Sequence, residues 1–216
     1  MVAWGEMLAG MGRNCGWLTA YTAKEYHKRL MKRTFLPELL IDQSRWDVDA
    51  IYIPEKDLDF ESECERLTKV MDEKDSVNIF LSEGAGTSTI VNELKDSGES
   101  ITLDAFGHVA LDELNPGQWF AKQFAKKLNA DKTLVQKSGY FARSAAPNSQ
   151  DLDLIQRSSK LAADYALQGK SGVVGMDEDD QDQLTLIGFE RIKGGKPFDF
   201  EQSWFNDLLT DIGQPK

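Results

Sequence analysis

Three short segments of the sequence combine glycine with charged or hydroxyl-bearing side chains. The segment Gly139-Tyr140-Phe141-Ala142-Arg143 follows a β-favouring run and precedes a helical pattern. Glycine lets the backbone approach a ligand, arginine presents a planar fork of donors that matches phosphate, and tyrosine adds a hydroxyl. By itself this pattern fits a phosphate-binding turn, and it also fits a surface ion pair beside a packing aromatic ring.

The other two segments have the same character. Met11-Gly12-Arg13 comes before a helical pattern, where N–H groups and a guanidinium suit an anion, although a simple loop explains these residues alone more directly. Glu83-Gly84 follows an apolar run. Glu83 could accept hydrogen bonds from sugar hydroxyls or cap the following helix, and both interpretations stay open.

The elements that position these segments alternate between strand and helix. Alternation of this kind predicts an α/β fold with a mostly parallel sheet, in which ligands bind outside the carboxyl ends of the strands. Residues 1–10 have weak periodicity and two glycines, which makes them hard to assign. Strands are predicted at 48–53, 77–81, 101–103 and 132–136, helices at 17–31, 58–72, from 88, 116–128, 151–167 and 204–212, and a hairpin at 173–189.

Composition excludes several classes of protein. The 216 residues carry a net charge of −11, which argues against a nucleic-acid surface. No apolar run approaches the ~20 residues that span a bilayer, and the first residues do not resemble a signal peptide. Cys15 and Cys64 fall in separate predicted helices without metal-ligand neighbours, so we expect reduced, structural thiols and a cytoplasmic protein.

Other polar residues receive structural interpretations. His108 has no second ligand at metal-binding spacing and is interpreted as a hydrogen-bonded structural histidine, and His27 as an exposed one. The acidic run from Asp177 to Asp182 lacks the glycine and terminal glutamate of a calcium loop, so a solvated turn is predicted.

The three glycine-containing segments, taken in order with Ile53-Pro54-Glu55, resemble the phosphofructokinase family. The stretches 104–109 and 136–143 are similar to its pyrophosphate-dependent branch, and the resemblance runs from Met11 to Ile212. It implies a three-layer, mostly parallel Rossmann-like sheet, truncated on its N-terminal side. Residues 11–216 would form the C-terminal, fructose 6-phosphate-binding domain, and residues 1–10 a leader foreign to the family.

The resemblance also implies roles for individual residues. The segment Met11, Gly12 and Arg13 would contact the sugar phosphate, Glu83 would bind sugar hydroxyls, and Tyr140 and Arg143 would hold the 6-phosphate. The whole enzyme acts in glycolysis and transfers a phosphoryl group from pyrophosphate to the 1-hydroxyl of fructose 6-phosphate. Mg²⁺ neutralises the donor, and a homo-oligomer is compatible with the family.

Two motifs of complete family members do not occur in this sequence. These are the Gly-Gly-Asp loop that holds the donor and the Thr-Ile-Asp segment whose aspartate is the general base. We therefore expect no catalytic residue, no Mg²⁺ site and no donor site in this chain, with pyrophosphate bound by the missing half. A truncated enzyme is the first hypothesis; a non-catalytic sugar-phosphate-binding or regulatory module and an inactive fragment are the alternatives.

Overall fold

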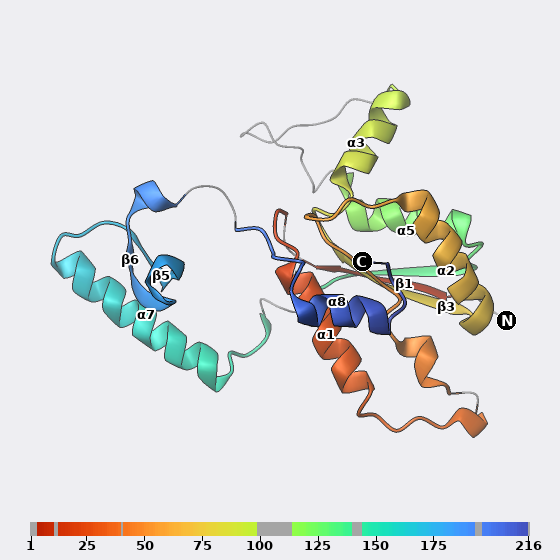
Figure 1. The fold of residues 1–216 in the computed structure, drawn as a ribbon, viewed down its shortest axis with the longest axis horizontal. Helices are drawn as coiled ribbons and strands as arrows, with labels where there is room; N and C mark the ends of the chain where they lie inside the picture. The colour runs from red at the N-terminus through yellow and green to blue at the C-terminus, as the bar shows by residue number, and fades with distance from the viewer. Residues whose placement is uncertain are drawn as a thin grey trace. The chain divides into compact units, whose positions relative to one another are not determined.

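The computed structural model describes residues 4–10, 13–39, 41–98, 114–139, 144–192 and 196–215, which belong to two compact units (Figure 1). The first unit contains the described residues up to 139 together with those from 196 onward, and the second contains residues 144–192. The predicted strand at 101–103 and His108 lie outside the described residues.

The first unit is built on a four-stranded sheet in which every pair of neighbouring strands is parallel. Its order is β2-β3-β1-β4, so β1 is an interior strand. The predicted parallel sheet is confirmed, whereas the position of residues 4–10 between β3 and β4 was not predicted. The strands are β1 (Trp4–Gly10), β2 (Ala50–Tyr52), β3 (Ser76–Ser82) and β4 (Lys132–Lys137).

The helices of this unit confirm the predicted periodic segments. The α2 helix begins after Asp59, whose side chain accepts a hydrogen bond from the Ser62 N–H, and α5 begins at Pro116. The helices are α1 (Trp17–Leu30), α2 (Phe60–Lys74), α3 (Thr87–Asp96), α5 (Pro116–Lys127) and α8 (Ser203–Asp211), with short 3₁₀ turns at Pro37–Leu39 and Gln43–Trp46.

Helices cover both faces of the sheet and produce three layers (Figure 1). The chain moves from β1 to β2 through α1, and then in the opposite direction through α2 and α5. Right-handed crossovers place helices on opposite faces when the direction reverses. Accordingly α1 and α8 pack on one face, and α2, α3 and α5 pack on the other.

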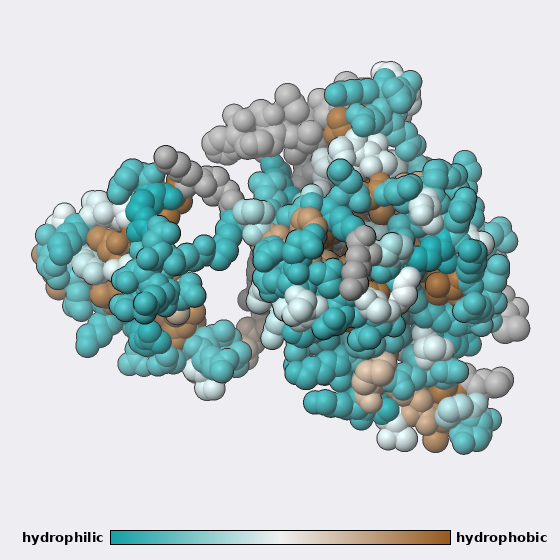
Figure 2. Space-filling view, viewed as in Figure 1, coloured by the Kyte–Doolittle hydropathy of each residue, from teal (hydrophilic) through white to brown (hydrophobic). Residues whose placement is uncertain are grey.

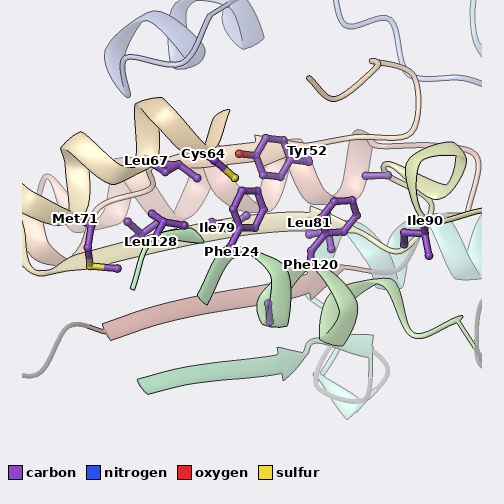
Figure 3. Packing of buried hydrophobic residues seen from close by; sticks show 14 residues of the cluster. Tyr52, Cys64, Leu67, Met71, Ile79, Leu81, Ile90, Phe120, Phe124 and Leu128 are labelled. Atoms are coloured by element: carbon purple, nitrogen blue, oxygen red, sulfur yellow. The ribbon is translucent and has the colours of Figure 1, made fainter. Parts of the chain in front are cut away.

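Alternation along β3 divides the core between these two faces. Ile79 and Leu81 pack with α2 and α5, where Phe120 and Phe124 lie close to them in Figure 3. Phe80 points to the opposite face and packs with α1 and α8. Because both faces of β3 are buried, the strand is a nearly continuous apolar run, as expected for a parallel sheet.

The C-terminal segment completes the α1 side of the first unit. Phe198 is buried there with residues of α8. Gln214, nearly fully buried, pairs through its side-chain amide with the N–H and C=O of Ile51, at 2.8 and 3.1 Å. This amide satisfies backbone groups on the outer edge of β2, which would otherwise be unpaired.

The second unit consists of α7 (Ser149–Leu167) and the antiparallel hairpin β5 (Val173–Asp177) and β6 (Gln183–Ile187), with 3₁₀ turns at Glu178–Asp180 and Phe189–Arg191. The predicted helix and hairpin are therefore confirmed. The acidic run forms the turn of the hairpin, as expected. The turn also contains an ion pair: the Arg191 guanidinium donates to both carboxylate oxygens of Asp177, each at 2.6 Å.

Two minor predictions require correction. His27 is half-buried rather than exposed, and its Nδ1 lies 2.7 Å from Oδ1 of Asp47. Cys15 precedes α1 instead of lying within a helix, whereas Cys64 is buried in α2, and both thiols are free. Burial is the main cause that raises the pKa of the Cys64 thiol to about 11, which makes this thiol unreactive.

Hydrophilic residues cover most of the face seen in Figure 2, with hydrophobic residues scattered between them. Among the described residues, no helix has the length and apolar character needed to cross a membrane.

Candidate functional site

The four parallel strands of the first unit end at the same edge of the sheet. Gly10 of β1 pairs in register with Ser82 of β3, and Ala9 pairs with Lys137 of β4. On the other side of β3, Tyr52 pairs with Leu81. The segments that follow β1 and β3 contain the predicted residues Arg13 and Glu83, so both segments leave the sheet at this common edge, where ligands bind in open α/β folds.

The segments after β1 and β3 are in direct contact. A Cβ atom built on Gly84 would lie 1.8 Å from the carbonyl oxygen of Arg13 and 2.6 Å from its carbonyl carbon. Only glycine allows the two backbones to approach this closely. Gly84 is buried, while the neighbouring Arg13 and Glu83 are half-buried. Arg13 and Glu83, which were predicted for one site and are 70 positions apart in the chain, therefore lie on two segments that touch.

A tight turn fixes the segment that contains Glu83. The N–H of Ala85 donates to the carbonyl of Ser82 at 2.9 Å, and the hydroxyl of Thr87 donates to the carbonyl of Gly84 at 2.7 Å. Gly86 has a φ of +61° and is the N-cap residue of α3. Glu83 therefore does not occupy the N-cap position, and its predicted role in binding sugar hydroxyls stays a prediction.

The segment after β2 contributes a carboxylate that the sequence analysis did not place in the site. The N–H of Gly16 donates to Oε1 and Oε2 of Glu55, at 2.9 and 3.1 Å, and the N–H of Phe198 donates to Oε1 at 2.7 Å. The sequence left open an anion or a simple loop before α1, and the structure places the carboxylate of Glu55 against the start of this helix. The sequence signal that could have identified Glu55 is its position directly after Pro54, at the end of a predicted strand.

Four predicted site residues, Met11, Gly12, Tyr140 and Arg143, lie outside the described residues. The described part of the chain reaches Gly139, directly after β4, and resumes at Ser144. Since β4 ends level with β1, the strand order is compatible with the predicted site. The roles of these four residues stay predictions.

The described residues do not fit a metal centre. In the part of the chain that the structure describes, no group of three or more His, Cys, Asp or Glu side chains is placed to hold a metal ion. The Mg²⁺ implied by the family resemblance is therefore assigned to none of the described residues. What the described edge of the sheet can offer chemically is an arginine and a carboxylate on adjacent turns, which suits binding of an anionic, hydroxylated ligand.

Comparison with known proteins identifies the relationship. Over 206 residues the chain is 53% identical to the pyrophosphate–fructose 6-phosphate 1-phosphotransferase of Methylomonas methanica and 50% identical to that of Mastigamoeba balamuthi. The chain is a homologue of the pyrophosphate-dependent phosphofructokinases. Each alignment covers 95% of this chain and 50% of the relative, so the chain corresponds to a segment about half as long as these phosphofructokinases. No family model matches it.

A solved structure supports the fold. The chain is similar, with a TM-score of 0.55, to the crystal structure of a pyrophosphate-dependent phosphofructokinase from Nitrosospira multiformis. The alignment covers the whole of this chain and 49% of the other. At 13% identity this similarity concerns the fold alone, and it confirms a mixed α/β architecture of the phosphofructokinase type.

Proposed function

We propose that this chain is the C-terminal, fructose 6-phosphate-binding half of a pyrophosphate-dependent phosphofructokinase. The whole enzyme would transfer a phosphoryl group from pyrophosphate to the 1-hydroxyl of fructose 6-phosphate in glycolysis. The observation that carries the proposal is the contact between Arg13 and Gly84 at the carboxyl edge of a parallel sheet. Identity above 50% to the Methylomonas methanica relative supports the substrate class.

Each site residue has a proposed role. Arg13 and Arg143 neutralise the sugar phosphate, Tyr140 donates to it through its hydroxyl, and Met11 and Gly12 contact it together with Arg13. Glu83 accepts hydrogen bonds from the sugar hydroxyls. These groups position the acceptor, and positioning with charge stabilisation is what phosphoryl transfer requires of the protein.

The domain organisation follows from the same proposal. Residues 11–216 are the proposed sugar-phosphate-binding domain, and its Rossmann-like sheet also includes residues 4–10 of the expected leader, which form the interior strand β1. The general base, the Gly-Gly-Asp donor loop and Mg²⁺ then belong to the complementary half of the enzyme. A homo-oligomer is compatible with this arrangement.

Titration calorimetry with fructose 6-phosphate tests the proposed function. Arg143→Ala should weaken binding by ~1.5–3 kcal/mol, because a charge-assisted phosphate contact is lost. Arg157→Ala is the matched control, since Arg157 forms an exposed pair with Asp153 in α7, at 3.3 Å. Equal affinities of the parent chain and Arg143→Ala would remove Arg143 from the site. No heat of binding from the parent chain would contradict the proposed function itself.

A further inference from the structure

Glu55 connects three parts of the first unit. It follows β2, it accepts hydrogen bonds from Gly16 at the start of α1, and it accepts one from Phe198 in the returning C-terminal segment. Three acceptor contacts from two backbone N–H groups, at 2.7 to 3.1 Å, involve both carboxylate oxygens. Such charge-assisted hydrogen bonds are stronger than neutral ones.

Gly16 is fixed by shape as well as by Glu55. A Cβ atom on Gly16 would lie 2.4 Å from Cβ of Ile53, so the start of α1 packs directly on the end of β2. Gly16 is also the N-cap residue of α1, and its N–H faces the carboxylate rather than a ligand. A negative charge there suits the partial positive charge of the helix N-terminus.

The segment from Arg13 to Gly16 is therefore held at both ends. At one end the carbonyl of Arg13 lies against Gly84, and at the other end Gly16 is bound by Glu55. Three Cα–Cα steps of 3.8 Å separate Arg13 from Gly16, which limits their separation to about 11 Å. Because only Asn14 and Cys15 lie between the two residues, we expect a displacement of Gly16 to shift Arg13 as well.

We propose that Glu55 is a positioning residue for sugar-phosphate binding: it acts through Gly16 to hold Arg13 in place at the carboxyl edge of the sheet. This inference rests on the proposed function, in which Arg13 binds the phosphate. Glu55 itself does not touch the ligand. The N–H of Gly16 is bonded to the Glu55 carboxylate, so in this proposal the phosphate contacts the side chain of Arg13 instead.

Glu55→Gln is the sharpest perturbation, because it keeps the size of the side chain. Its amide has only one acceptor oxygen, and the NH₂ group would face the N–H of Gly16 or Phe198. Asp59→Asn is the matched control. Asp59 also accepts a backbone N–H at a helix N-terminus, that of Ser62 at 3.2 Å, but it belongs to α2 and not to the segment of Arg13.

A double-mutant cycle in fructose 6-phosphate affinity separates positioning from general stability. We expect Glu55→Gln to weaken binding about ten-fold in the parent chain. In the Arg13→Ala background the same change should alter binding by less than about two-fold, because Glu55 acts through Arg13. Asp59→Asn should leave the affinity unchanged. Equal affinity of Glu55→Gln and the parent, or the same ten-fold loss in both backgrounds, would overturn the proposal.

Hydrogen exchange at the Gly16 amide, measured by NMR, keeps the proposal testable if the parent chain binds no fructose 6-phosphate. Absence of binding would overturn the proposed function. Faster exchange at Gly16 in Glu55→Gln than in Asp59→Asn would still support Glu55 as the residue that holds this segment. Equal exchange rates at Gly16 in the two variants would overturn the claim that Glu55 holds this segment.

Discussion

Gly84→Ala is the substitution that most directly tests the contact at the centre of the candidate site. The added methyl group would lie 1.8 Å from the carbonyl oxygen of Arg13, and the neighbouring atom is backbone rather than a flexible side chain. The two segments would have to separate by roughly 1.5–2 Å to reach an ordinary van der Waals distance. Forced shifts of this kind cost about 1–3 kcal/mol.

The expected consequences concern stability and binding together. For a chain of this size each kcal/mol lowers the melting temperature by about 2–4 °C, so Gly84→Ala should melt roughly 2–12 °C below the parent. Fructose 6-phosphate affinity should fall at least about ten-fold, because Arg13 and Glu83 are moved apart. Both effects arise from the same displacement.

Tryptophan fluorescence is the appropriate measurement of unfolding. All five tryptophans, at positions 4, 17, 46, 119 and 204, belong to the first unit, so the signal reports on this unit alone. Lys122→Ala is the control, since Lys122 is an exposed residue of α5 in the same unit. If Gly84→Ala matched this control in melting temperature and in calorimetric affinity, the contact between the two turns would not exist as described.

Three further predictions concern catalysis and pH. The first uses a fusion of this chain to the complementary half of the enzyme. In this fusion Glu83→Gln should raise KM by about ten-fold with a smaller effect on kcat, because a contact with the bound substrate is lost. A fall in kcat alone would contradict the proposed role of Glu83. The chain by itself should show no turnover in a coupled assay with Mg²⁺, fructose 6-phosphate and either pyrophosphate or ATP, because no general base is proposed in it. A turnover rate near roughly one per second would refute this prediction. In the second unit, hydrogen bonding to Arg191 lowers the pKa of Asp177 below 3.8, so this pair stabilises the unit above pH 3.8 and the stabilisation is lost as the pH falls below it. The measurement is amide hydrogen exchange of residues 173–187 as a function of pH. Asp177→Asn should remove the loss of protection at low pH, and the control Asp153→Asn should keep it. Equal pH profiles of the two variants would exclude the Asp177–Arg191 pair as the cause.

Most helices and strands of the fold could be predicted, because each depends on the spacing of apolar residues within a short stretch of sequence. Apolar residues at helical spacing placed α1, α2, α5 and α7, and short apolar runs placed β3 and β4. The alternating order of strands and helices was enough to predict a parallel sheet. The glycine-containing segments with Arg13, Glu83 and Arg143, taken in order, likewise resemble the phosphofructokinase family.

What only the tertiary structure decided is how distant segments meet. Residues 4–10 have weak periodicity, and their place inside the sheet depends on pairing with β3 and β4, which no local window contains. The need for glycine at position 84 comes from the backbone of Arg13, and the role of Glu55 comes from Gly16 and Phe198, 39 and 143 residues away. Periodicity reports which face of an element is buried, whereas contacts across turns depend on strand order and register, and these are set only when the whole sheet assembles.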